Sequence, residues 1–173
     1  MPAYAGIGSR QTPDEALALI HDAARTLRER GYVLRSGHAP GADQAFERGA
    51  GAAAEIYLPW SSFEAAVPPV ADYVQRQASD AAFELAAQHH PGWPYLKRSS
   101  RALHARNCHQ VLGRDLGSPA EFVLCWTPDG SLDGTGRKVG GTGQALRLAA
   151  AHGIAVFNLA RAEHEQRVRA MLA

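Results

Sequence analysis

The sequence predicts an α/β fold in which helices cover both faces of a doubly wound parallel sheet. Short apolar runs alternate with segments whose apolar residues follow helical spacing, and glycine-rich turns separate the two. Right-handed connections and about five strands in the order 3-2-1-4-5 satisfy this pattern. A chain of 173 residues with 46% hydrophobic residues can build a core of its own. We therefore expect residues 1–173 to form a single domain.

Strands are expected where apolar runs end in turn residues. The first run, at residues 3–7, ends in the turn Gly6-Ile7-Gly8-Ser9-Arg10. The other strands are expected at residues 32–36, 55–58, 120–126 and 154–159.

Helix signals lie between these runs. Thr12 and Glu15 form a capping box around Pro13, and the helix that follows ends at Gly31. A second capping box is expected at residues 61–64. Further helices are expected at residues 44–53, 70–88, 99–112, 141–153 and 161–171. The polar, glycine-rich residues 127–140 predict a mobile surface loop.

Charge and composition exclude several classes of protein. The chain carries 18 basic and 17 acidic residues, which disfavours a protein that coats nucleic acid, although a nucleic-acid partner stays possible. Of the basic residues 16 are arginine, which we attribute to coding bias, so a lone arginine is weak evidence for phosphate binding. There is no membrane-length apolar run and no signal peptide. We expect a cytoplasmic protein without a membrane partner.

Cysteine and histidine patterns indicate no metal and no cofactor. Cys108 and Cys125 form neither a CxxC pair nor a metal spacing, and reduced thiols are the simplest account. The adjacent pair His89 and His90 is expected to be solvated.

Three glycine-rich turns are expected at one edge of the sheet, where open α/β sheets bind ligands. Glycines let a backbone approach a ligand, and a helix start favours phosphate. A dinucleotide fingerprint is incomplete, because Gln11 replaces its third glycine, and no phosphate-binding Walker motif is present. The expected binding residues in these turns are Gly8, Ser9, Arg10, Ser36, Gly37, Gly41, Ala42, Asp43, Gly140, Gly141 and Thr142.

Several other residues each allow two interpretations, one functional and one structural. Trp60 either stacks on a base at this edge or belongs to the core. The pair Arg106 and Asn107 either grips a phosphate or forms a solvated helix face. Should the protein be an enzyme, Asp43 and Glu55 are the expected catalytic carboxyls, and Asp129 and Asp133 are further candidates.

The glycine turns and the Arg106-Asn107 pair resemble the Rossmann-like SLOG superfamily over nearly the whole chain. The most specific match is Ser36-Gly37-His38-Ala39-Pro40-Gly41-Ala42-Asp43, which is similar to the corresponding segment of the DNA-processing DprA (Smf) proteins. Small stand-alone bacterial and phage members of the YspA type resemble this chain best. The resemblance implies a nucleotide-like ligand, a ligand role for Arg106 and Asn107, and a homodimer formed through the helices of residues 70–112.

One departure separates this chain from the LONELY GUY phosphoribohydrolases of the same superfamily. Their glycine segment is followed by a catalytic glutamate, whereas residues 140–146 here contain no acid. We therefore expect a protein that binds a nucleotide or nucleotide-derived ligand. The alternatives are a nucleotide N-glycosidic hydrolase or transferase, acting for example on a nucleoside monophosphate, and single-stranded DNA binding as in DprA.

Overall fold

The computed structural model describes residues 1–136 and 140–173. Its centre is one sheet in which every pair of neighbouring strands is parallel, with the order β4-β3-β2-β1-β5-β6. The strands are β1 (Ala3–Gly8), β2 (Val33–Ser36), β3 (Ala54–Tyr57), β4 (Tyr73–Gln75), β5 (Phe122–Trp126) and β6 (Ala155–Asn158). The predicted α/β class is confirmed, and the five predicted strands keep their relative order.

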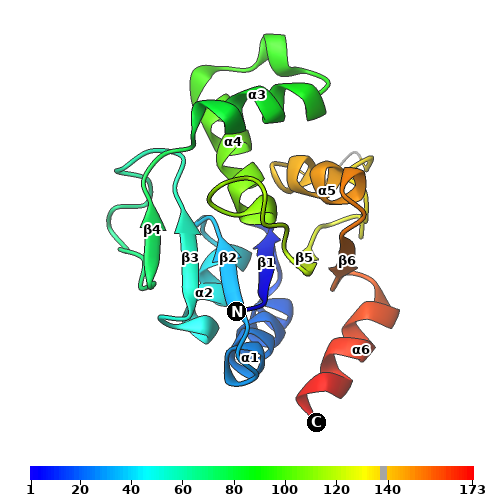
Figure 1. Ribbon diagram of the computed structural model, residues 1–173. Helices are drawn as coiled ribbons and strands as arrows, with labels where there is room; N and C mark the ends of the chain where they lie inside the picture. The colour runs from blue at the N-terminus through cyan, green and yellow to red at the C-terminus, as the bar shows by residue number, and fades with distance from the viewer. Residues whose placement is uncertain (137–139) are drawn as a thin grey trace.

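Helices form a layer on each side of this sheet. They are α1 (Asp14–Glu29), α2 (Ala42–Ala50), α3 (Asp80–His89), α4 (Arg98–Leu112), α5 (Thr142–Ala151) and α6 (Ala162–Leu172), with a 3-10 turn η1 (Trp93–Tyr95). Figure 1 shows α3, α4 and α5 at the top of the view and α1 and α6 at the bottom. Because side chains alternate along a strand, Tyr4 of β1 packs with α1 and α2 while Ala5 packs with α4 and α5.

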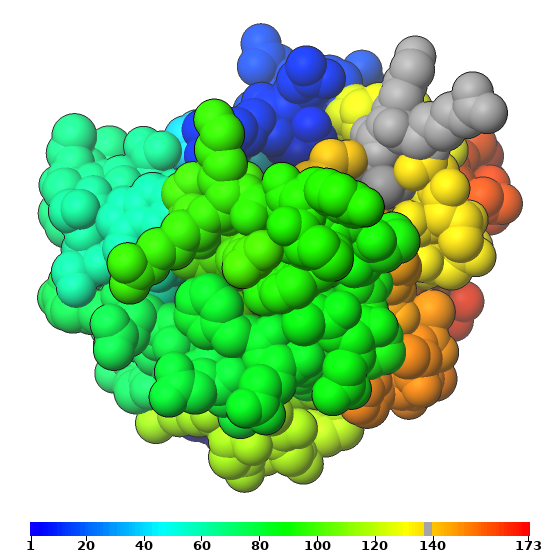
Figure 2. All heavy atoms as spheres, turned by 90° about the horizontal axis from the view of Figure 1, so that it is seen from above, coloured from blue at the N-terminus to red at the C-terminus, as the bar shows by residue number. Residues whose placement is uncertain are grey.

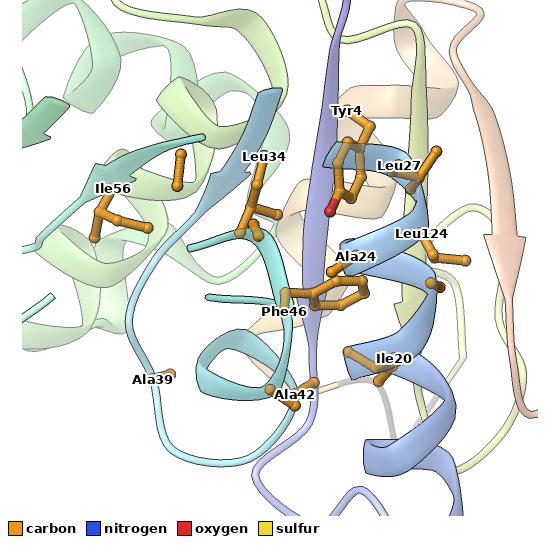
Figure 3. Packing of buried hydrophobic residues seen from close by; sticks show 14 of the residues in the cluster. Tyr4, Ile20, Ala24, Leu27, Leu34, Ala39, Ala42, Phe46, Ile56 and Leu124 are labelled. Atoms are coloured by element: carbon orange, nitrogen blue, oxygen red, sulfur yellow. The ribbon is translucent and has the colours of Figure 1, made fainter. Parts of the chain in front are cut away.

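The core on the α1 and α2 side is built around aromatic rings. Tyr4 stacks on Phe122 with ring centroids 5.6 Å apart, and Phe46 meets Tyr4 edge-on at 6.2 Å. Leu34 and Ile20 belong to the same cluster of buried side chains (Figure 3). This packing fixes α2, and with it the turn that precedes α2, against the end of β1.

The helix predicted at residues 70–88 is confirmed for residues 80–88 and wrong for residues 70–79. Tyr73, Val74 and Gln75 form the edge strand β4, paired with β3, and α3 starts only at Asp80. Aromatic and β-branched residues suit this strand, and Ser79 caps the helix by accepting a bond of 3.3 Å from the N–H of Ala82. Residues 61–64 form turns instead of a helix start.

Two helix starts also differ from the prediction. The N-cap of α1 is Pro13, and the Thr12 hydroxyl instead donates a 2.7 Å hydrogen bond to the carbonyl of Ser9. Helix α2 begins at Ala42, two residues before the predicted start at Gln44, because its first turn packs directly against β1.

Part of the loop predicted at residues 127–140 is anchored to β6. The Asn158 amide donates to the Thr127 hydroxyl at 2.6 Å and to the Ser131 carbonyl at 2.8 Å. Residues 137–139 of that predicted loop lie outside the described residues. Among the described helices, none has the length and apolar character needed to cross a membrane.

Candidate functional site

A pocket of about 410 Å³ opens at the carboxyl edge of the sheet. It lies beside β1, the strand at which the order of the sheet reverses, with α4 and α5 as its walls. Figure 2 shows this face from above, with the green of α3 and α4 in the centre, the dark blue N-terminal segment above it and the yellow-to-orange residues before and within α5 to its right. The predicted residues that line the pocket are Gly8, Ser9, Arg10, Asp43, Arg106, Asn107, Gly140, Gly141 and Thr142.

The turn after β1 is held in shape by the protein's own bonds. The N–H of Ser9 donates to the carbonyl of Trp126 at 3.1 Å, and the Ser9 hydroxyl accepts from the N–H of Gln11 at 3.0 Å. The Arg10 side chain leaves this turn at the pocket mouth, where it is 58% exposed and 3.9 Å from Glu64. Arg10 is therefore an exposed cation in the lining of the pocket.

The turn before α2 supports this first turn from behind. Gly41 has φ +92, and a Cβ there would lie 2.8 Å from the Ser9 carbonyl oxygen, so only glycine allows this approach. The Cβ of Ala42 packs against Gly8, and Ser36 is fully buried. Ser36, Gly37, Gly41 and Ala42 thus lie behind the pocket lining and not in it.

Arg106 of α4 is a buried cation on the pocket wall. Its Nη1 donates to the carbonyls of Gly37 and, at 3.2 Å, of Tyr57, and its Nε donates to Oδ1 of Asn107 at 2.8 Å. Burial lowers the pKa of Arg106 and the charge of Asp43 raises it again, and a guanidinium stays protonated at neutral pH. The hydrogen bonds of this side chain to the described residues are thus made by Nε and Nη1.

Asn107 joins α4 to the start of α5. Its amide nitrogen donates to the carbonyl oxygen of Gly141 at 3.0 Å. The N–H of Thr142, the first residue of α5, has no acceptor within its own helix, and the Thr142 hydroxyl lies beside it. The two walls of the pocket are therefore fixed to each other next to a group of polar donors.

Asp43 is the carboxyl group of this pocket. One carboxylate oxygen accepts a 3.3 Å hydrogen bond from the N–H of Ala39. Burial raises the pKa of Asp43 to about 6, although the Arg106 charge opposes this rise, and the charge of Glu47 adds to it. The group is therefore ionised at neutral pH yet takes up a proton in mildly acidic solution.

A buried pair that we did not predict from the sequence lies behind Asp43. His38 has φ +63, and its Nδ1 lies 2.5 Å from a Glu47 carboxylate oxygen, while its Nε2 meets the carbonyl of Val67. Burial lowers the pKa of His38, but the hydrogen bond and charge of Glu47 outweigh burial and raise it. Glu47 follows Asp43 by four residues, so it lies one helical turn further along the same face of α2. This spacing could have identified Glu47 from the sequence.

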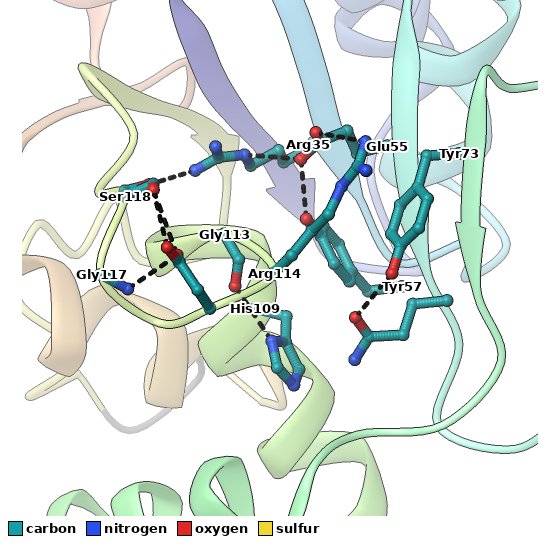
Figure 4. Close-up of polar contacts among 11 residues, drawn as sticks. Arg35, Glu55, Tyr57, Tyr73, His109, Gly113, Arg114, Gly117 and Ser118 are labelled. Atoms are coloured by element: carbon teal, nitrogen blue, oxygen red, sulfur yellow. Dashed lines mark hydrogen bonds and ion pairs between the residues drawn. The ribbon is translucent and has the colours of Figure 1, made fainter.

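Glu55 lies outside the pocket, in a separate polar cluster (Figure 4). Its two carboxylate oxygens accept bonds of 2.9 Å from Arg35 and Arg114 and one of 2.7 Å from the Tyr57 hydroxyl. Burial favours the protonated form, but Tyr57 and the two arginines outweigh it and hold the pKa of Glu55 below its usual range. The structure therefore does not bring the two expected catalytic carboxyls, Asp43 and Glu55, together.

The remaining expected residues are also away from the lining. Trp60 is 36% exposed and meets Phe63 edge-on at 5.3 Å. Asp129 accepts a bond of 3.2 Å from the Thr127 hydroxyl, and Asp133 one of 2.6 Å from that of Thr135. Within the described residues, no group of three or more His, Cys, Asp and Glu side chains is arranged to hold a metal ion.

The wall formed by α4 contains lining residues that sequence reasoning missed. Leu103 and Gln110 lie on the same helix face as Arg106 and Asn107, at helical spacing. Leu103 precedes Arg106 by three residues and Gln110 follows it by four. Helical spacing from the Arg106-Asn107 pair could therefore have identified both residues. The other lining residues, Ile7, Gln11, Ala39, Pro128 and Ala145, carry no comparable sequence signal.

Fold and site thus define an α/β protein with a pocket at the switch point of a parallel sheet, lined by charged, polar and apolar side chains. No protein-family model and no curated protein matches the sequence. Among solved structures, DNA processing protein A from Helicobacter pylori, studied for its single-stranded DNA binding mode, is a distant structural neighbour. The match has a TM-score of 0.42 and 14% sequence identity, and it covers 99% of this chain and 80% of that chain.

Proposed function

We propose that this protein binds a nucleotide or nucleotide-derived ligand in the pocket beside β1, with the ligand's phosphate at the pocket mouth. The single observation that carries the proposal is Arg106, a buried guanidinium on the pocket wall whose hydrogen bonds to the described residues are made by Nε and Nη1. A buried cation is suited to an anion held by charge-assisted hydrogen bonds.

The groups around Arg106 support the same ligand. Thr142 offers a hydroxyl and the first N–H of a helix, where the helix dipole favours an anion. Arg10 adds a second, exposed charge at the mouth. A volume of about 410 Å³ falls in the range of small-molecule sites. The formal charge of +1 fits a small ligand held locally better than a long polyanion.

Isothermal titration against nucleoside mono- and diphosphates, ADP-ribose and cyclic nucleotides tests this proposal. We expect one or more of them to bind the wild type, and Arg10→Ala to weaken that binding about tenfold through loss of a charged contact. Arg48→Ala is the matched control, because Arg48 is an exposed arginine in the last turn of α2. Absence of binding for every ligand of the panel would contradict the proposal.

An oligothymidine belongs in the same panel. Tight binding of the oligonucleotide alone, with affinity that falls steeply as salt rises, would favour single-stranded DNA as the ligand. Equal affinity of the Arg10→Ala and Arg48→Ala variants for every ligand would place the binding site elsewhere.

A second candidate function is cleavage of the N-glycosidic bond of a nucleotide. The observation that favours it is Asp43, a carboxyl in the pocket whose pKa of about 6 suits proton transfer near neutral pH. Incubation with nucleoside monophosphates and chromatography for free base is the test. Release that is no faster than with Asp43→Asn removes this candidate and leaves the binding proposal intact.

A further inference from the structure

Gln110 is a buried amide on the pocket wall without a partner. Its side chain lines the pocket, the residue is only 1% exposed, and its Nε2 has no hydrogen-bond partner. Buried polar atoms in native proteins are nearly always hydrogen-bonded, and an unpaired one is a cost to the fold. The unpaired atom is the one assigned as the amide nitrogen.

The course of α4 places Gln110 deeper in the molecule than the expected phosphate site. Arg106 contacts the carbonyls of Gly37 and Tyr57, which lie at the carboxyl ends of β2 and β3. Seven residues later, Gly113 packs against Arg35, which lies within β2. The helix thus runs inward from the edge of the sheet, and Gln110 lies one turn, or about 6 Å, further in than Arg106.

The surroundings of Gln110 differ from those of the mouth. Ile7 of β1 and Ala145 of α5 line the same pocket and are both buried. An apolar inner end with a single amide suits a flat heterocycle whose edge offers a hydrogen-bond donor beside an acceptor. The glutamine amide carries the complementary pair, as in its usual pairing with the N6 and N7 edge of adenine.

We propose that Gln110 is the specificity-determining residue of this site and reads the edge of the ligand's base. This inference rests on the proposed nucleotide binding and extends it. The base enters the inner end of the pocket and pairs with Gln110, and the phosphate stays at the mouth with Arg106 and Thr142. The ligand class is a nucleotide, and adenine is the base that an amide recognises best.

Titration calorimetry with AMP, GMP, CMP, UMP and ribose 5-phosphate tests the role of Gln110. Ribose 5-phosphate has the sugar and phosphate but no base. We expect the wild type to prefer AMP to ribose 5-phosphate by tenfold or more. Gln110→Leu abolishes that preference and leaves the affinity for ribose 5-phosphate unchanged. Gln110→Glu keeps the shape of the side chain but removes the amide donor, so it also weakens AMP binding.

Thermal unfolding without ligand gives a second readout. Gln110→Leu removes an unpaired buried amide, so its unfolding midpoint should equal or exceed that of the wild type. Gln144 is the matched control, since it is fully buried but its amide is paired with the Ala86 carbonyl at 3.2 Å and with Arg147 at 3.2 Å. Gln144→Leu should lower the midpoint.

The outcomes separate the two proposals. A Gln110→Leu variant that keeps the wild-type preference for AMP overturns the inference, while binding that depends on Arg10 still supports the proposed function. Equal binding of all four nucleotides and ribose 5-phosphate to the wild type overturns the inference in the same way. A wild type that binds no member of the panel overturns both.

Discussion

The side-chain amide of Asn107 donates a 3.0 Å hydrogen bond to the carbonyl oxygen of Gly141. The oxygen of the same amide accepts from Nε of Arg106 at 2.8 Å. One side chain therefore orients the buried guanidinium and fixes the start of α5 against α4. Because these are the two walls of the pocket, Asn107 sets their spacing as well as the direction of the charge.

Replacing Asn107 by leucine removes both bonds without changing the volume greatly. We expect the free energy of unfolding to fall by about 2 kcal/mol, since each buried hydrogen bond contributes about 1 kcal/mol. Nucleotide affinity should fall about tenfold, because Arg106 loses its orientation. Urea unfolding and titration calorimetry measure the two effects. Asn107→Asp keeps the acceptor for Arg106 and should have the smaller effect on affinity. If both variants lost the same affinity, the orientation of Arg106 by this acceptor would not matter for binding.

Gly37 leaves room for the Arg106 side chain. A Cβ at this position would overlap with Nη1 of Arg106. Gly37→Ala must therefore displace the guanidinium, and we expect a loss of nucleotide affinity together with about 1–3 kcal/mol of stability. Gly117→Ala is the control, because its Cβ would meet nothing closer than 3.7 Å. Unchanged affinity in Gly37→Ala would mean that Arg106 does not contact the ligand.

Glu55 should matter for stability and not for the ligand. It links Arg35 of β2 to Arg114, which follows α4, and all three lie away from the pocket. We expect Glu55→Gln to lower the free energy of unfolding by about 2–4 kcal/mol, because it leaves the mostly buried Arg35 without its charge partner. Nucleotide affinity should stay within twofold of the wild type.

Glu163→Gln is the matched control for that variant. The pair of Glu163 with Arg161 is solvent-exposed, so its loss should leave urea unfolding unchanged. A Glu55→Gln variant that is as stable as the wild type but has lost a nucleotide-cleaving activity would contradict this prediction. Glu55 would then act in catalysis although it lies outside the pocket.

The parts of the molecule that could be predicted from sequence are those with local signals. Apolar runs that end in glycine turns predicted the strands, and the turn after β1 and the start of α5 do lie at one pocket. Strand β4 was missed because Tyr73, Val74 and Gln75 are extended only through pairing with β3. The pairing of Glu55 with Arg35 and Arg114 likewise joins residues far apart in the chain.

The second glycine turn illustrates the same limit. Its composition predicted a loop directed at phosphate, and Asp43 does line the pocket. Gly41, however, uses its positive φ to let the turn before α2 pack on Ser9 and Arg10. A glycine needed for contact with a ligand and one needed for contact with a neighbouring turn have the same sequence pattern. Only the packing distinguishes the two.

The pKa of Asp43 predicts how stability changes with pH. Its ordinary value is 3.8, and burial raises it to about 6 in the folded protein, with Arg106 opposing and Glu47 adding to the rise. A raised carboxyl pKa means that the folded state binds the proton more tightly than the unfolded state. The stability that this proton contributes is therefore complete below about pH 4 and is lost as pH rises through about 6.

Asp43→Asn mimics the protonated group at every pH and isolates this effect. At pH 7.5 we expect the variant to be about 2–3 kcal/mol more stable than the wild type, from a shift of about two pKa units. At pH 4 the two proteins should unfold at nearly the same urea concentration. Comparing them at each pH cancels the titration of other groups, including His38, whose pKa is also raised. A stability difference that does not change between pH 4 and pH 7.5 would mean that the Asp43 carboxyl keeps its ordinary pKa, and that Arg106 compensates for its burial.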